Sequence, residues 1–130
     1  MNTDEALVGG DARDPLTGRI LEAAFEVSNV LGNGFLEAVY QRAMLKELTL
    51  TGLTAEREVG FRIAYKGDAI GTYVADLVVE RSVIVELKAV EALAQSHIGQ
   101  CLNYLRASGL RTALLLNFGR PKLEFKRVRL

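Results

Sequence analysis

Residues 73–90 read YVADLVVERSVIVELKAV, two apolar runs separated by a polar Glu-Arg-Ser turn at 80–82. Runs of Val, Ile, Leu and Ala bounded by turn residues are typical of buried strands, so this stretch predicts a β-hairpin at the centre of a sheet. Asp76, Glu86 and Lys88 lie inside the apolar runs. Ionised groups in such a place cost several kcal/mol unless they are paired or bind a metal, so they indicate a function.

The length of the turn decides whether the two acids meet. Side chains alternate across a strand, so Glu86 and Lys88 share one face of the sheet. A two-residue turn would leave Asp76 pointing away from Glu86, whereas a three-residue loop at 80–82 sets Asp76 opposite Glu86. We therefore expect the three-residue loop, or a bulge, and all three charged side chains on one face.

Two carboxylates at this separation repel each other, and a divalent cation between them turns the repulsion into coordination. Carboxylate oxygens are hard ligands that favour Mg²⁺ or Mn²⁺. Asp76 and Glu86 therefore predict a metal site in the hairpin.

The spacing Asp76-x9-Glu86-x-Lys88 resembles the catalytic signature of the PD-(D/E)XK nuclease superfamily. An acid-x-Lys tripeptide is common, and a cross-strand salt bridge is the alternative interpretation of these charges.

Three further stretches resemble the GxxExxY protein family, a small nuclease-like branch of the same superfamily. They are GFLEAVY at 34–40, HIGQCLNYLR at 97–106 and LLNFG at 115–119, in the order of that family. With them the resemblance extends over about residues 16–130, nearly the whole chain.

The resemblance implies a magnesium- or manganese-dependent nuclease. It implies that Asp76, Glu86 and the carbonyl of Leu87 hold the ion, and that Lys88 assists the attacking water. It also implies site roles for Glu37, on a helix, and for Gln100, on the helix after the lysine strand.

Each of these helix positions has an alternative structural role. Glu37 in a first helical turn is favoured by the helix dipole alone. Four accessory positions lie near the implied site: Gly34, Tyr40, His97 and Tyr104. Tyr40 is equally consistent with a buried aromatic whose hydroxyl is satisfied, Tyr104 with packing beneath Gln100, and the single His97 with a structural or solvated side chain.

Composition indicates a compact globular protein. The 130 residues are 49% hydrophobic with two prolines, enough for one core, so we expect a flexible leader at 1–13 and a single domain at 14–130. No apolar run approaches ~18 residues and no signal peptide is recognisable, so we expect a cytoplasmic protein without membrane contact. Cys101 is expected to be a small buried hydrophobe.

Charge is balanced overall but uneven along the chain. The totals are sixteen basic and sixteen acidic residues, yet from Arg106 onward seven basic residues face one acid. This basic end could face phosphates or could only protect a sheet edge from aggregation. In the first case it predicts weak, salt-sensitive binding to DNA or RNA.

The rest of the pattern predicts an α/β fold with element order ααβββαββ, a mixed sheet flanked by helices. The expected elements are helices at 15–31, 36–48 and 92–106, strands at 59–65, 111–118 and 123–130, and the hairpin at 73–90. This order is similar to the restriction-endonuclease-like core of the PD-(D/E)XK superfamily.

Two functions remain open at this point. One is a metal-dependent phosphodiesterase acting on nucleic acid. The other is a catalytically silent module of the same fold that binds nucleic acid or a protein partner, which neutral charge and short length favour. Without a large DNA-binding appendage, the protein is expected to form a homodimer, to take small or structured substrates, or to serve a partner.

Overall fold

The structure is a computed structural model that describes residues 14–130, so the leader predicted at 1–13 lies outside the described residues. Two helices, three strands, a helix and two strands follow one another, in agreement with the predicted order. The elements are α2 (Pro15–Leu31), α3 (Glu37–Leu50), β1 (Ala55–Tyr65), β2 (Asp68–Val79), β3 (Val83–Lys88), α4 (Gln95–Ser108), β4 (Thr112–Asn117) and β5 (Glu124–Arg129). Between residues 14 and 130, no helix combines the length and apolar character needed to span a membrane.

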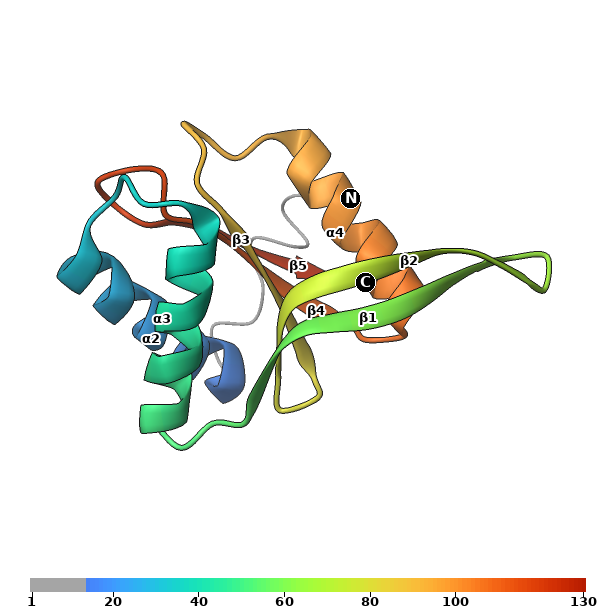
Figure 1. Cartoon of the computed structure of the whole chain (residues 1–130), viewed down its shortest axis with the longest axis horizontal. Coiled ribbons are helices and arrows are strands. Elements are labelled where there is room, and N and C mark those ends of the chain that lie inside the picture. Colours follow the sequence, from blue (N-terminus) through green and yellow to red (C-terminus); the bar gives the residue numbers. More distant parts are fainter. Residues whose placement is uncertain (1–13) are drawn as a thin grey trace.

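The strands form one mixed sheet in the order β1-β2-β3-β4-β5. Only β3 and β4 are parallel, because α4 carries the chain across the sheet between them. Helices α2 and α3 pack on one face of the sheet and α4 on the other (Figure 1). The central strands therefore have apolar side chains on both faces, as the sequence of the hairpin predicts.

The predicted register of the hairpin is confirmed. Val79 pairs with Val83, which leaves a three-residue loop at 80–82. Glu80 and Arg81 adopt the left-handed region with φ of 52° and 53°, and the N–H of Ser82 donates to the carbonyl of Val79 at 3.0 Å. This loop sets Asp76 of β2 and Glu86 of β3 at the same level of the hairpin.

Strands β1 and β2 are longer than predicted, and their distal halves extend beyond the body of the protein as a two-stranded arm, residues 60–74 (Figure 1). Residues 55–58 (AERE) are too polar to read as a strand, so the prediction started at Val59. They are a strand because they complete the ladder with the end of β2, where Ala55 pairs with Val79. Tertiary pairing here outweighs local propensity.

Helix α4 begins at Gln95, three residues after the predicted Ala92. The N–H of Ala94 donates to Nδ1 of His97 at 2.9 Å, and the N–H of His97 donates to the carbonyl of Ala94 at 3.0 Å. His97 therefore closes the first turn of the helix, which gives this accessory position a structural role.

The loop at 89–94, between β3 and α4, is fixed by hydrogen bonds to Asn117, the last residue of β4. Asn117 is fully buried, accepts the N–H of Val90 at 3.0 Å and donates to the carbonyl of Val90 at 3.0 Å. Its amide also donates to Glu124 at 3.1 Å. These contacts keep the residues after Lys88 in a loop, which is why the helix starts late.

The two apolar layers are well filled. Cys101 is buried at 1% exposure in the α4 layer, as expected for a small hydrophobe. Tyr40 is fully buried in the α2/α3 layer and stacks on Phe118 with ring centroids 4.6 Å apart. Its hydroxyl donates to the carbonyl of Gly32 at 2.7 Å and accepts the N–H of Phe35 at 3.3 Å, so the structural interpretation of Tyr40 holds.

Gly119→Ala tests the contact beneath the 89–94 loop. A Cβ at Gly119 would collide with the backbone N and O of Val90 and lie 2.7 Å from the carbonyl carbon of Ala89. We expect urea denaturation to show an unfolding free energy lower by about 1–3 kcal/mol, the usual cost of overpacking. Gly99→Ala in α4, where nothing lies within 4 Å, should instead be neutral or stabilising. Equal effects of the two substitutions would contradict this packing.

Candidate active site

The centre of the site is the point where β2 and β3 stop pairing through their backbones. The last regular pair is Leu77 with Val85. Beyond it, Oε2 of Glu86 accepts the N–H of Asp76 at 3.0 Å, and Oδ2 of Asp76 accepts the N–H of Leu87 at 2.8 Å. Each acid is thus hydrogen-bonded to the strand of the other, and both side chains lie in the gap between the strands.

The regular alternation of side chains changes at Asp76. Residues of β2 before it, Tyr73 and Ala75, belong to the α4 layer, whereas Leu77 after it belongs to the α2/α3 layer. Its neighbour on β1 is Glu58, which has a left-handed φ of 55°. The expectation that simple alternation sets Asp76, Glu86 and Lys88 on one face is therefore wrong. Asp76 reaches the lysine strand because the β1–β2 ladder is interrupted at Glu58 and Asp76.

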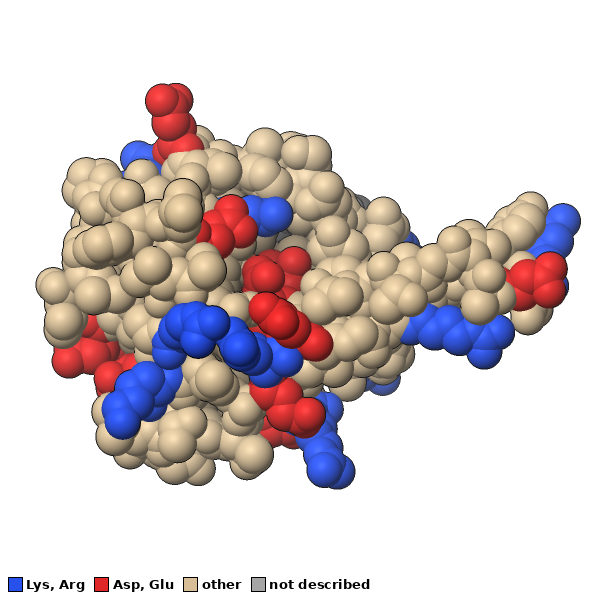
Figure 2. Space-filling view, in the orientation of Figure 1, with Lys and Arg blue, Asp and Glu red and all other residues tan. Residues whose placement is uncertain are grey.

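Beside Asp76 is a small acidic hollow of about 190 Å³, lined by Glu37, Ala38, Gln41, Glu58, Asp76 and Leu87. Figure 2 shows acidic side chains gathered in the middle of this face, between α3 and the base of the arm. A water molecule occupies roughly 30 Å³ of liquid, so the hollow can hold an ion with part of its hydration shell.

Burial raises the pKa of the Glu86 carboxyl to about 7, and repulsion from Asp76 adds to the rise. Burial also raises the pKa of Asp76; the Leu87 N–H acts against this shift, and the nearby charges of Glu37 and Glu58 reinforce it. The site therefore holds negative charge at a cost, which a bound cation would remove.

The donor set fits a magnesium-type ion. Hydrogen bonds within residues 14–130 engage only one oxygen of each acid, Oδ2 of Asp76 and Oε2 of Glu86, so Oδ1 and Oε1 remain for a ligand. Across the same residues no three His, Cys, Asp or Glu side chains converge on one point. Mg²⁺ is commonly held by one or two carboxylates and otherwise by water and substrate oxygens, whereas a structural Zn²⁺ needs more side chains.

Lys88 ends β3 next to these acids and is partly buried. Its positive charge acts to lower the pKa of both Asp76 and Glu86, against the stronger effect of burial, which raises the pKa of each. In the described part of the chain it forms no ion pair, so the alternative interpretation, a direct cross-strand salt bridge, is not what the structure shows. The ammonium remains available to a third group.

A family model described as the PD-(D/E)XK nuclease superfamily matches residues 14–128. The chain belongs to this superfamily. The crystal structure of SSO0001 is similar with a TM-score of 0.56 and 19% identity, over 78% of this chain and 51% of that one. The likeness shows the shared fold and confirms the predicted α/β, restriction-endonuclease-like class, and the chain spans about half the length of SSO0001. No curated protein matches the sequence.

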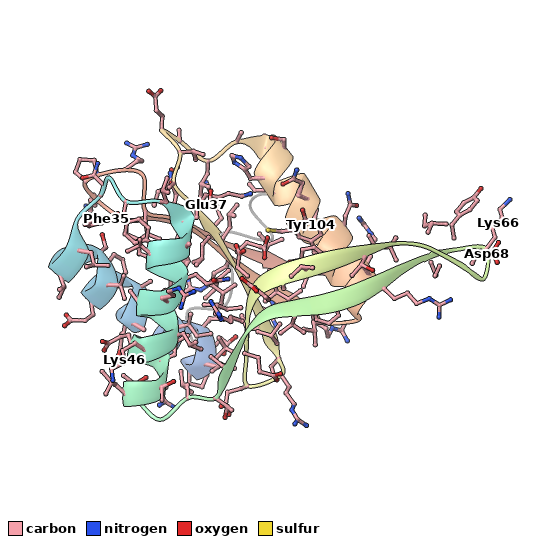
Figure 3. All side chains as sticks on the ribbon, in the orientation of Figure 1. Phe35, Glu37, Lys46, Lys66, Asp68 and Tyr104 are labelled. Atoms are coloured by element: carbon pink, nitrogen blue, oxygen red, sulfur yellow. The ribbon has the colours of Figure 1, made fainter. Side chains whose placement is uncertain are left out.

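The two helix residues expected at the site of this superfamily member are placed differently. Glu37 is the first residue of α3, lines the acidic hollow and lies at the end of α3 that faces β3 (Figure 3). Gln100 is exposed on α4 and does not line the hollow. Its side chain makes no hydrogen bond to any residue between 14 and 130. Burial raises the pKa of its neighbour Cys101, and the charge of Glu86 adds to the rise.

Two residues support the site that the sequence did not single out. The Tyr73 hydroxyl donates to Oε2 of Glu86 at 2.8 Å, and the Tyr104 ring stacks on Tyr73 with centroids 3.6 Å apart. The amide of Gln41 donates to the carbonyl of Asp76 at 3.1 Å. Gln41 could have been found as a polar residue one turn after Glu37 on an otherwise apolar helix face.

Two other expectations concern residues outside the acidic hollow. Gly34 has φ of 116° in the turn before α3 and lines an adjoining hollow with Ala89 and Gly119, and Glu37 lines both hollows. Three of the seven basic C-terminal residues, Lys126, Arg127 and Arg129, lie on β5, the edge strand two positions from β3, where Lys126 and Arg127 alternate between the faces. Binding of nucleic acid by that strand stays a prediction.

The raised pKa of Glu86 predicts how stability depends on pH without metal. Between its ordinary value of 4.5 and about 7, the unfolded state loses this proton while the folded state keeps it, so the unfolding free energy falls as pH rises. In chelator, Glu86→Gln should remove this fall and be more stable than wild type at pH 8, on the order of 1–3 kcal/mol.

Urea denaturation of both proteins at pH 5 and pH 8 measures the effect. Glu22→Gln, on the exposed side of α2, is the matched control and should follow wild type at both values. A difference between Glu86→Gln and wild type that is the same at the two pH values would contradict the pKa shift.

Proposed function

We propose that the protein is a nuclease that hydrolyses phosphodiester bonds of DNA or RNA with Mg²⁺ or Mn²⁺. The observation that carries the proposal is the reciprocal bonding of Asp76 and Glu86, in which residues 14–130 engage only one oxygen of each acid, with Lys88 at the end of the same strand as Glu86. Membership of the superfamily supports the class of reaction. The GFLEAVY stretch supports placement in its GxxExxY branch, and the chain composition supports a cytoplasmic location.

Each residue of the proposed site has its own role. Asp76, Glu86 and the Leu87 carbonyl would hold the ion, which when bound polarises the phosphate and lowers the pKa of the attacking water. Lys88 would orient that water and offset the negative charge that develops on phosphorus in the transition state. Glu37, at the wall of the acidic hollow, is suited to accept a proton or a hydrogen bond from water there.

Two positioning residues hold these groups in place. The Tyr73 hydroxyl donates to Oε2 of Glu86 and so fixes the orientation of the carboxylate. Oε1 accepts no hydrogen bond from residues 14–130. Gln41 ties α3 to the backbone of Asp76, which fixes the distance between Glu37 and the metal carboxylates. Such outer hydrogen bonds orient ligands and typically change metal affinity or activity by 10- to 100-fold when removed.

Substitutions at the carboxylates and at the lysine should have different effects. Asp76→Ala or Glu86→Ala removes a ligand, so magnesium binding by calorimetry and cleavage of oligonucleotides should be lost together. Lys88→Ala removes a cation beside the ion, so metal affinity should persist or rise while cleavage falls by ~10² or more. Glu22→Ala, exposed on α2, controls for charge and purity.

The catalytic proposal fails if wild-type protein binds no divalent ion, or if it cleaves no better than Glu86→Ala. Either result, in protein that still folds, would favour the non-catalytic binding module. Single- and double-stranded DNA and RNA should all be supplied, because the balanced net charge does not select among them.

Tyr73→Phe tests the positioning of Glu86 separately. Loss of the hydroxyl removes one donor to Oε2 without changing the stacked ring, so magnesium affinity should fall about 10-fold. Tyr65→Phe, at the exposed tip of the arm, is the matched control and should bind magnesium like wild type. Equal metal affinity in Tyr73→Phe and wild type would show that the hydroxyl does not orient the ligand.

A further inference from the structure

A separate hollow lies between the arm and the C-terminal half of α4. None of the residues assigned to the metal ion or to the attacking water lines it. This arm groove has a volume of about 610 Å³ and is lined by Arg62 and Ala64 of β1 and by Asn103, Tyr104 and Arg106 of α4, among others. It therefore has two arginines and an aromatic ring on its walls, and no acidic residue.

Within residues 14–130, no acidic side chain pairs with either of the two arginines. Nη1 of Arg106 donates to Oδ1 of Asn103 at 3.1 Å, so a neutral amide, and not a carboxylate, orients this guanidinium. A guanidinium presents a fork of N–H donors that suits phosphate oxygens, so the groove suits an anion with oxygen acceptors.

Two packed rings connect the groove to Glu86. Tyr104 lines the groove, and its ring stacks on Tyr73, whose hydroxyl is hydrogen-bonded to Glu86. Figure 3 shows Tyr104 between the central strands and the base of the arm, whose tip is marked by Lys66 and Asp68. The arm groove therefore begins one aromatic ring away from the carboxylates that would hold the metal.

We propose that the arm groove binds the phosphodiester backbone of the nucleic-acid strand whose scissile phosphate lies at Asp76 and Glu86. The inference rests on the proposed function, because the position of the scissile phosphate decides which phosphates of the strand lie in the groove. Arg62 and Arg106 take flanking phosphates from the two sides of the groove, and Tyr104 offers a surface on which a base can stack. An acidic peptide could also pair with the two arginines. It would not explain why the groove lies next to the proposed phosphodiester site.

The first test removes the two arginines together. Arg62→Ala with Arg106→Ala should weaken binding of labelled single- and double-stranded DNA and RNA oligonucleotides about 10-fold, measured by fluorescence anisotropy in chelator. Loss of two phosphate contacts should also make the log-log dependence of affinity on salt shallower by about 1.4 to 1.8. Magnesium binding by calorimetry should equal that of wild type, because neither arginine touches the carboxylates.

A matched double variant controls for net charge. Arg81 lies in a hollow with Glu56 and Glu80, and Lys46 is exposed on α3, so neither residue lines the groove. Arg81→Ala with Lys46→Ala removes the same formal charge and should leave the affinity and its salt dependence within about twofold of wild type.

A second pair of variants leaves both arginines intact. Ala64 and Ala69 are exposed cross-strand partners in the arm, and only Ala64 lines the groove. Ala64→Glu puts a carboxylate among the phosphates and should weaken oligonucleotide binding at least threefold more than Ala69→Glu. Both substitutions are on the surface of the arm, so circular dichroism should show the same fold for both.

The outcomes separate the groove from the catalytic proposal. If wild-type protein binds no oligonucleotide, if the control variants lose as much affinity as the groove variants, or if a polyglutamate peptide binds as tightly as the oligonucleotides, the groove does not bind nucleic acid. If oligonucleotide binding depends on Arg62 and Arg106 while wild-type protein neither binds magnesium nor cleaves, the groove assignment stands and the nuclease proposal fails.

Discussion

Two carboxylates buried in a sheet need hydrogen-bond donors or a cation, and this requirement determines the structure at the centre of the molecule. Asp76 and Glu86 solve it by each accepting the backbone N–H of the opposite strand. The exchange ends the ladder between β2 and β3, so these strands separate at the place where the acids need room. A sheet that stayed paired here would bury both charges without access to an ion.

The separation of the strands in turn depends on parts of the chain remote from it. Helix α3 reaches the backbone of Asp76 through Gln41, and α4 covers Glu86 through the stacked rings of Tyr73 and Tyr104. The two sheet faces are thus not equivalent. The α3 face is open and acidic at the hollow, whereas the α4 face is aromatic beside the carboxylate.

Sequence patterns were sufficient for features that depend on local order. The turn length at 80–82, the register of the hairpin and the placement of Glu37 at a helix start all follow from periodicity and spacing. The twist at Glu58 and Asp76 could not be predicted, because it shows only when β1 pairs with β2. Tyr73 and Gln41 were missed because their roles depend on which groups the fold places beside them.

One consequence of the Asn117 contacts concerns the order in which the site can be completed. Asn117 bonds Val90, 27 positions earlier in the chain, and β4 reaches β3 only after α4 has crossed the sheet. During synthesis, the hairpin with both carboxylates can therefore form before the residues that fix the loop after Lys88 have been added. The two acids are brought together by contacts that are local in the chain, whereas the loop after Lys88 is fixed by long-range contacts that need β4.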